Sequence, residues 1–286
     1  MVTMTDNDGR RIGDMTYEEK KQKLQKQMLV YAQGDMLVAF SGGVDSSLIL
    51  KLAVQAAAKT GHKVYGIMMH TMLHPMGEVE DARVTAEQIG AEFRVLEIDE
   101  LKGADILDNP VDRCYRCKKY LFRNLIEEGE KLGVSAMMEG TNEDDLHVYR
   151  PGLRAIRELG IHSPLAEAGM TKAEVRKLAG ELGVSVSNKP SMPCLATRFP
   201  YGTRISYETM RKVDEGEAFI RSLGFYNVRL RIHNDVARIE VDVNEMSHLL
   251  EHCEQIVAKL KNLGYDYITV DLEGFRSGSM DLHVKK

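Results

Sequence analysis

The sequence lacks the features that mark an exported or membrane-spanning chain. Residues 1–15 contain no apolar core of the about 7–15 residues that a signal peptide requires, and no apolar run approaches the roughly 20 residues of a membrane span. An excess of positive charge is also missing. The net charge is −5, which gives no overall attraction to nucleic acid or to an anionic membrane. We therefore expect a cytoplasmic protein that binds neither a membrane nor a nucleic acid.

Cysteine is scarce as well. Four cysteines in 286 residues argue against a disulfide framework and favour a metal site or catalytic sulfur. Cys114 and Cys117 form a Cys-x-x-Cys pair, and Cys194 follows in the segment PSMPCLATRFPYG. Cys253 lies in LLEHCEQIV, where helical spacing predicts a buried cysteine.

The first three cysteines suit more than one kind of centre. Three thiolates can hold a [4Fe-4S] cluster and leave one iron open for a substrate or a sulfide, and we favour this interpretation. A structural zinc site would need a fourth ligand, for which His74, His147 and His162 are available. A redox dithiol is the third possibility.

From residue 17 to residue 200, apolar runs of strand length alternate with amphipathic helices. The predicted strands are 36–40, 63–70, 93–99 and 134–140, and the predicted helices are 17–33, 47–59, 78–89, 118–132 and 172–182. Such alternation indicates crossover units, so residues 17–200 are predicted to form a doubly wound α/β domain with a parallel sheet covered on both faces. Residues 1–16 are expected to be disordered.

After residue 200 the pattern changes. Residues 227–233 and 237–243 alternate with period two like half-exposed strands. The other predicted elements are helices at 206–222 and 244–262 and a strand at 267–272. We therefore predict that residues 201–286 form a small α+β domain for substrate binding or oligomerisation. One face of its sheet is expected to be apolar, and the other to carry Arg229, Arg231 and His233.

The stretch AFSGGVDSSL, residues 39–48, places a glycine-rich loop between a strand and a helix. Backbone N–H groups and the helix dipole at such a junction suit a phosphate group. The sequence has no GxxxxGK[ST] motif, and GxGxxG does not fit SGGVDS. A tight turn that only allows close packing is the alternative. The predicted phosphate-binding residues are Ser41, Gly42, Gly43, Asp45, Ser46 and Ser47.

This loop resembles the SGG-x-DS loop of the PP-loop ATP pyrophosphatases, which grip the pyrophosphate of ATP and cleave between its α and β phosphates. The resemblance implies an adenine nucleotide α hydrolase-like fold, with Asp45 helping to hold Mg²⁺. The segment EGTNEDD, residues 139–145, resembles the adenine and ribose contact region of the family. Its matching residues are Gly140, Thr141 and Asn142. Lys118 and Arg198 are candidate phosphate partners by position alone.

Six segments extend the likeness along the chain: SGGVDSS, EGTNEDD, YRPGL, RFPYGT, RLRIHNDVARIE and GFRSGS. Together they resemble the LarE family of PP-loop sulfur transferases, over nearly the whole chain beyond residue 17. Such enzymes use ATP to adenylate the carboxylate of pyridinium-3,5-biscarboxylic acid mononucleotide and install sulfur from sulfide. The products are the thiocarboxylates of the nickel-pincer cofactor of lactate racemase. The resemblance also implies a homo-oligomer.

In many members of this family a single cysteine near RFPYGT gives up its own sulfur and becomes dehydroalanine, and Cys194 matches that position. Cys114 and Cys117 are additional, and they match the branch in which three cysteines hold a [4Fe-4S] cluster. In that branch the sulfide is carried on the open iron. The sequence leaves both modes open.

The anionic mononucleotide needs cations, and Arg229, Arg231 and Arg276 can supply bidentate phosphate contacts. Glu217, Asp235 and Arg238 are expected to line the same site. A solvated strand face is the alternative for the strand arginines.

Two other functions deserve comparison. A PP-loop tRNA thiolation enzyme shares the loop and the three-cysteine cluster, but such enzymes usually carry extra Cys-x-x-Cys zinc modules, and the acidic charge argues against tRNA. A nucleotide- or metal-binding sensor without turnover is the second alternative. The intact Asp45 and both loop glycines argue against it.

Overall fold

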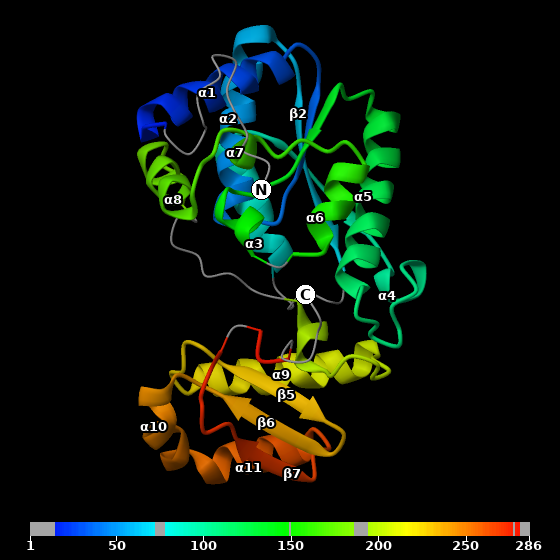
Figure 1. Cartoon of the computed structure of the whole chain (residues 1–286), viewed down its shortest axis with the longest axis vertical. Coiled ribbons are helices and arrows are strands. Elements are labelled where there is room, and N and C mark those ends of the chain that lie inside the picture. The colour runs from blue at the N-terminus through cyan, green and yellow to red at the C-terminus, as the bar shows by residue number, and fades with distance from the viewer. Residues whose placement is uncertain (1–14, 72–77, 149, 186–193, 277, 281–286) are drawn as a thin grey trace. The chain divides into compact units, whose positions relative to one another are not determined.

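The computed structural model describes residues 15–71, 78–148, 150–185, 194–276 and 278–280 (Figure 1). His74, Tyr149 of the YRPGL segment and residues 1–14 of the expected disordered stretch lie outside the described residues. The chain forms two compact units, and each is described by itself. The first unit comprises the described residues among 15–71, 78–100 and 114–185, and the second comprises those among 101–113 and 194–280.

Four parallel strands form the sheet of the first unit, in the order β3-β2-β1-β4. They are β1 (Met36–Ala39), β2 (Val64–His70), β3 (Glu92–Glu97) and β4 (Ala136–Met138). Strand β1 is buried along its whole length, because it has a neighbouring strand on each side and helices on both faces. The predicted doubly wound α/β fold is confirmed.

Helices cover both faces of this sheet (Figure 1). One face carries α1 (Tyr17–Tyr31), α2 (Val44–Thr60), α3 (Glu78–Ile89), α7 (Pro164–Glu167) and α8 (Lys172–Glu181). The other carries α5 (Arg113–Leu132) and α6 (Gly152–Glu158). Along β1, Met36 and Val38 pack into the first core and Leu37 and Ala39 into the second. This is the period of two that a strand requires.

The second unit is built on a three-stranded sheet in the order β5-β6-β7. Strands β5 (Arg229–His233) and β6 (Val236–Glu240) are antiparallel, and β7 (Tyr267–Val270) runs parallel to β6. Helix α9 (Tyr207–Ser222) packs closely at Gly216, where a Cβ would lie 2.8 Å from Leu230 of β5 and 3.0 Å from Leu260. The remaining helices are α10 (Met246–Glu251), α11 (Cys253–Asn262) and the short α4 (Glu100–Gly103) at the sequence boundary between the units. The 3-10 helices are η2 (Asp144–His147) in the first unit and η3 (Leu195–Arg198) and η4 (Val243–Glu245) in the second.

The prediction of a single helix over residues 244–262 is wrong. The chain forms two helices there, separated at His252, whose backbone leaves helical values (φ −99°, ψ 11°). Because of this break Cys253 is the first residue of α11, and its side chain is exposed. The predicted burial of Cys253 is therefore also wrong, although Leu249 and Ile256 on either side of it are buried.

Strand β5 is less exposed than its alternating pattern predicts. The pattern places Arg231 on a half-exposed face, but its side chain is only 5% exposed and pairs with the fully buried Glu240 at 2.9 Å. A carboxylate on the neighbouring strand compensates the buried charge, and the pattern of one strand cannot show this. The expectation of a half-exposed face is wrong at Arg231.

In the part of the chain that the structure describes, no helix combines the length and the apolar character needed to cross a membrane.

Candidate active site

The glycine-rich loop connects β1 to α2 in the first unit. Gly42 has a left-handed backbone (φ +69°), and a Cβ there would lie 3.2 Å from the Cβ of Ala82 in α3. Both observations favour glycine at this position. Ser46 Oγ accepts a hydrogen bond from the backbone N–H of Ser41 at 3.2 Å and donates to the carbonyl of Gly43 at 3.1 Å. These bonds hold the loop in a closed turn.

Helix α2 begins without a side-chain cap. Its N-cap is Gly43, which offers no side-chain acceptor, whereas α1, α8 and α9 each begin with a capping box. The first N–H groups of α2 are therefore left for another acceptor, and the helix dipole favours an anion in that place. Ser47 Oγ is buried and has no hydrogen-bond partner among the described residues. The junction thus offers the donors that a phosphate group needs.

The segment 139–145 lies against this loop. Because β4 pairs with β1 in parallel, the chain leaves both strands at the same edge of the sheet. A Cβ at Gly140 would lie 3.0 Å from the backbone nitrogen of Ser46 and 3.1 Å from the Cβ of Asp45. The side-chain amide of Asn142 donates to Asp45 Oδ1 at 3.1 Å. The structure brings together the two segments that the sequence associates with ATP.

We expect Gly140→Ala to push these two segments apart. The added methyl group would press on the backbone of α2, with an expected loss of about 1–3 kcal/mol in the free energy of unfolding and a roughly tenfold weaker affinity for ATP. Thermal denaturation and ATP titration measure the two effects. Gly180→Ala is the control, because a Cβ at Gly180 meets nothing within 4 Å. Equal effects of the two substitutions would contradict the prediction.

Lys172 of α8 completes this arrangement, although it was not among the residues predicted from the sequence. Its ammonium group forms an ion pair with Asp45 Oδ2, and its backbone N–H donates to Asp144 at 2.8 Å. A lysine at the first position of a helix opposes the helix dipole. That unfavourable position, directly after the cap residue Thr171, was the signal available in the sequence.

Carboxylates of this region suit a hard cation. Asp45 offers carboxylate oxygens, which Mg²⁺ prefers together with phosphate and water oxygens, so the donor chemistry fits magnesium bound with a triphosphate. A second carboxylate, Asp145, accepts from the backbone N–H of Asn142 at 3.2 Å and pairs with Arg150 at 2.9 Å. Burial raises the pKa of Asp145, and the charge of Arg150 acts against that rise.

Lys118 lies at the same edge of the sheet, next to the end of β4. Its Nζ is 3.9 Å from Glu139 and lies over the ring of Phe122 at 4.8 Å. Glu139 is buried and accepts from the backbone N–H of Thr141 at 3.0 Å and from Ser163 Oγ at 2.6 Å. The ammonium group of Lys118 therefore lies on the α5 side of the segment 139–145.

All four cysteines are thiols in the structure. Cys114 is exposed and Cys117 is half-buried near the start of α5, where a spacing of three puts both on one side of the helix. Cys194 is half-buried at the N-cap of η3, in the second unit. Thiolates are the ligands that iron–sulfur clusters and zinc prefer, so the donor chemistry fits both. Among the described residues, no group of three or more His, Cys, Asp and Glu side chains is placed to hold a metal ion.

The histidines considered as a fourth zinc ligand have other neighbours. His147 pairs with Glu143 at 2.9 Å. The ring of His162 packs against that of Tyr31, with 4.5 Å between the centroids.

Most charged residues predicted to bind substrate in the second unit are paired within the protein. Arg198 forms a bidentate pair with Glu217, at 2.8 and 3.0 Å. Burial by itself acts to raise the pKa of Glu217, but the hydrogen bonds and charge of Arg198 lower it overall. The other pairs are Arg231 and Arg238 with Glu240, and Arg276 with Asp271 and Glu273, while Asp235 is exposed in the turn between β5 and β6.

Arg229 differs from its neighbours. It makes no ion pair among the described residues. It donates to the carbonyl of Val228 at 2.6 Å and lies over the ring of Phe275 at 5.1 Å. Burial, followed by the positive charges of Arg198 and Arg231, lowers the pKa of Arg229 to about 10. An anion that bound to this partly buried guanidinium would stabilise its positive charge.

Comparison with known proteins identifies the family of this chain. The sequence model of the NAD synthase family matches residues 16–109. An uncharacterised protein of Synechocystis sp. is 36% identical over 86% of this chain and 91% of its own length. The pyridinium-3,5-bisthiocarboxylic acid mononucleotide synthase of Lactiplantibacillus plantarum is 38% identical over 90% of this chain and 93% of its own length. The chain belongs to the LarE family. It is thus an ATP-dependent sulfur transferase of the PP-loop class.

A more distant relative of this LarE-family chain is the tRNA-specific 2-thiouridylase MnmA of Rickettsia rickettsii. It is 28% identical over 55% of this chain and 52% of its own length.

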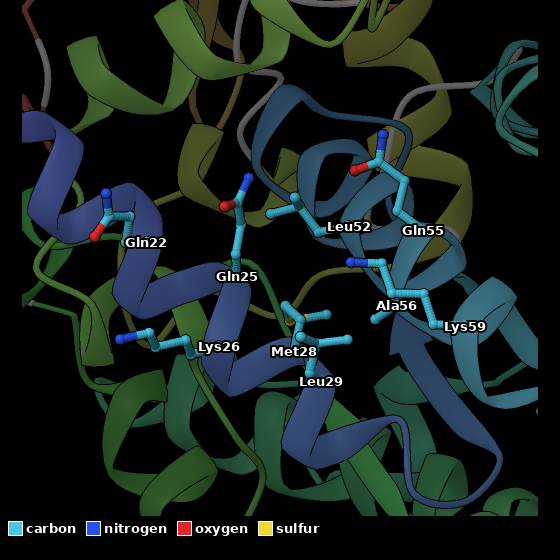
Figure 2. Close-up of a pocket in the computed structure, with 9 residues that line it drawn as sticks. All are labelled: Gln22, Gln25, Lys26, Met28, Leu29, Leu52, Gln55, Ala56 and Lys59. Carbon is cyan, nitrogen blue, oxygen red and sulfur yellow. The ribbon is translucent and has the colours of Figure 1, made fainter.

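A separate pocket of about 300 Å³ lies between α1 and α2 of this LarE-family chain (Figure 2). Its lining includes Gln25, Leu52 and Lys59, with the glutamine and lysine side chains around an apolar floor. None of the loop residues 41–47 lines it, so it is distinct from the candidate site at the glycine-rich loop.

Proposed function

We propose that this enzyme converts pyridinium-3,5-biscarboxylic acid mononucleotide into its thiocarboxylate form for nickel-pincer cofactor biosynthesis. The likeness to the synthase of L. plantarum over 90% of this chain supports the choice of substrate. The observation that carries the proposal is the meeting of Asp45, Asn142 and Lys172 beside the uncapped start of α2. This arrangement supports an activation step at a triphosphate, which a carboxylate acceptor requires.

In the proposed first step, a carboxylate oxygen of the substrate attacks the α-phosphorus of ATP. The bond between that phosphorus and the oxygen bridging to the β-phosphate breaks, and pyrophosphate leaves with the electron pair. The N–H groups at the start of α2 bind the phosphate oxygens. Asp45 would hold Mg²⁺, which would neutralise charge on the leaving pyrophosphate. Lys172, which pairs with Asp45 in the structure, would then be available to the phosphates.

In the second step, a sulfide sulfur attacks the carbonyl carbon of the adenylate. The C–O bond breaks, and AMP leaves with its electron pair. AMP is a good leaving group, whereas the oxygen of a free carboxylate is a poor one. Adenylation therefore lets a weakly basic sulfide complete the exchange.

We propose Cys114, Cys117 and Cys194 as the ligands of a [4Fe-4S] cluster. Such a cluster would supply an open iron able to bind sulfide, so that the protein would keep its own sulfur. The thiol donors support this assignment, and zinc at the same cysteines is the alternative.

The connection between the cysteine segments gives further support. Within the second unit, the Asn109 side chain donates to the carbonyl of Pro200 at 2.8 Å and accepts from Arg113 at 2.9 Å. Cys114 is the next residue after Arg113, and the RFPYGT motif that contains Pro200 begins four residues after Cys194. The segment that leads into the Cys-x-x-Cys pair is therefore hydrogen-bonded to Pro200, which lies six residues after Cys194 in the sequence.

We further propose that Arg229 binds the phosphate of the mononucleotide, with Arg231, Arg276 and Asp235 around it. The missing ion pair and the lowered pKa of Arg229 support an anion at this place. By family likeness, the enzyme is proposed to be a cytoplasmic homo-oligomer.

Arg229→Met is expected to weaken binding of the mononucleotide and to stabilise the fold. The folded-state pKa of Arg229 is lowered to about 10, so its charge costs stability at neutral pH. This cost begins to fall as the pH rises through about 10 and is gone only above the higher pKa of arginine in the unfolded chain. Removing the charge should raise the free energy of unfolding by on the order of 1 kcal/mol at most, since the group is partly exposed. The KM for the mononucleotide should rise roughly tenfold. Denaturant titration and steady-state kinetics measure the two effects, and a variant with unchanged KM would contradict this role.

Anaerobic turnover with ATP, sulfide and the dicarboxylated mononucleotide tests the function directly. Mass spectrometry should show the exchange of a carboxylate oxygen for sulfur, together with AMP and pyrophosphate. Absence of pyrophosphate release would refute activation by ATP. Salt-sensitive binding of tRNA and sulfur transfer to it would instead favour the thiouridylase function of the more distant relative.

A further inference from the structure

The backbone turn that begins at Cys194 is held by three hydrogen bonds to one carbonyl group. The carbonyl oxygen of Cys194 accepts from the backbone N–H of Thr197 at 3.2 Å, from Thr197 Oγ1 at 2.8 Å and from Arg198 Nη1 at 3.1 Å. Arg198 Nη1 also contacts Thr197 Oγ1 at 2.9 Å. The guanidinium and the hydroxyl together close the turn next to the thiol-bearing residue.

The same guanidinium ties this turn to the interior of the second unit. Its Nε and Nη2 donate to the two carboxylate oxygens of Glu217 in α9, and both side chains are only 1% exposed. Glu217 Oε1 also accepts from the backbone N–H of Leu230 in β5 at 2.9 Å. The turn at Cys194 is thus connected through Arg198 to a helix and a strand.

A second buried pair, Arg231 with Glu240, binds the other end of the turn. Arg231 Nη1 donates to the carbonyl of Thr197 at 2.9 Å, while its Nε and Nη2 bind Glu240. Two arginine–glutamate pairs therefore fix four residues of backbone. A buried ion pair is weak evidence for stability, because well-packed apolar residues often serve as well. The two arginines also donate to the carbonyls of Cys194 and Thr197. These directional bonds indicate that the pairs fix the backbone conformation of the turn.

We propose that the Arg198–Glu217 pair is a positioning device that holds the sulfur of Cys194 in place for sulfur transfer. This role replaces the phosphate contact considered for Arg198 and the substrate contact considered for Glu217, and it rests on the proposed function of Cys194. Only the planar fork of arginine can bind both carboxylate oxygens and a backbone carbonyl at once, so lysine is not an equivalent.

Alkylation of Cys194 by iodoacetamide in the resting, metal-free, reduced full-length protein tests the positioning. The rate is followed by peptide mass spectrometry relative to the exposed Cys253. In Arg198→Lys and in Glu217→Gln the turn should loosen, and the relative rate at the half-buried Cys194 should rise roughly tenfold. Arg221→Lys is the matched control, because Arg221 contacts the same Glu217 at 3.3 Å and makes no bond to the turn. Cooperative thermal unfolding shows that the variants are folded.

Kinetics separate positioning from a contact with ATP. In both variants kcat for thiocarboxylate formation should fall at least roughly tenfold, while the rate of pyrophosphate release in the first turnover and the Kd for ATP stay within about twofold. A folded variant with an unchanged alkylation rate at Cys194 would overturn the proposal. A parallel loss of pyrophosphate release in the first turnover would also overturn it and assign Arg198 to the phosphates. The alkylation result needs no substrate, so it stands even if the wild-type enzyme makes no thiocarboxylate.

Discussion

Asp45→Asn is expected to reduce pyrophosphate release by at least about 100-fold. Asparagine has nearly the same volume and can still accept from Asn142, so the loop should keep its fold. It carries no charge, however, and therefore binds neither Lys172 nor a magnesium ion as the carboxylate does. Pyrophosphate formed from ATP and Mg²⁺ in the presence of the mononucleotide measures the effect.

Two further variants serve as comparisons for Asp45→Asn. Glu143→Gln removes a carboxylate from the same segment, where it pairs with exposed His147, and it should keep the wild-type rate. Lys172→Met should lower the rate by a smaller factor, roughly tenfold, because the N–H groups at the start of α2 still bind the phosphates. A near-normal rate in Asp45→Asn would mean that the triphosphate is held elsewhere.

The fold of the first unit could be predicted from the sequence, because its elements are local patterns. Alternation of strands and helices implies parallel pairing, and parallel strands bring their carboxyl ends to one edge. The contact between Asp45 and Asn142 follows from that rule together with the pairing of β1 and β4. The position of Gly140 against Ser46 depends on the same pairing.

Contacts that depend on three-dimensional packing were not visible in the sequence. Lys172 lies 127 positions from Asp45 along the chain, and only the placement of α8 on the sheet brings its side chain to the loop. The pairing of Arg231 with Glu240 requires the register of two strands. Cys253 was misplaced because periodicity alone does not reveal the interruption at His252.

The interruption of the first unit by residues 101–113 also escaped the sequence analysis. This stretch joins the second unit through backbone bonds such as Ile205 N–H to the Leu107 carbonyl, at 2.8 Å. Asn109 adopts a left-handed backbone (φ +48°) there and is fully buried. Such anchoring by single polar residues leaves no periodic pattern in the sequence.

Cys114→Ala is expected to remove the iron–sulfur cluster and, with it, repeated turnover. Wild-type protein purified without oxygen should be brown, with absorption near about 400 nm, and should form thiocarboxylate many times per chain when sulfide is added. The variant should be colourless. It retains Cys194, so it should complete at most one sulfur transfer by giving up the thiol of that residue, and the protein mass should then fall by one H₂S.

Cys253→Ala is the matched control for Cys114→Ala, because both cysteines are exposed and Cys253 is not proposed as a ligand. It should keep the colour and the turnover of the wild type. Colourless anaerobic wild-type protein with one tightly bound zinc ion would overturn the cluster and favour the structural zinc site. Loss of mass at Cys194 in the wild type during turnover with sulfide would instead show that the protein's own sulfur is consumed. Because these outcomes differ in colour, metal content and mass, one anaerobic preparation of each variant distinguishes them.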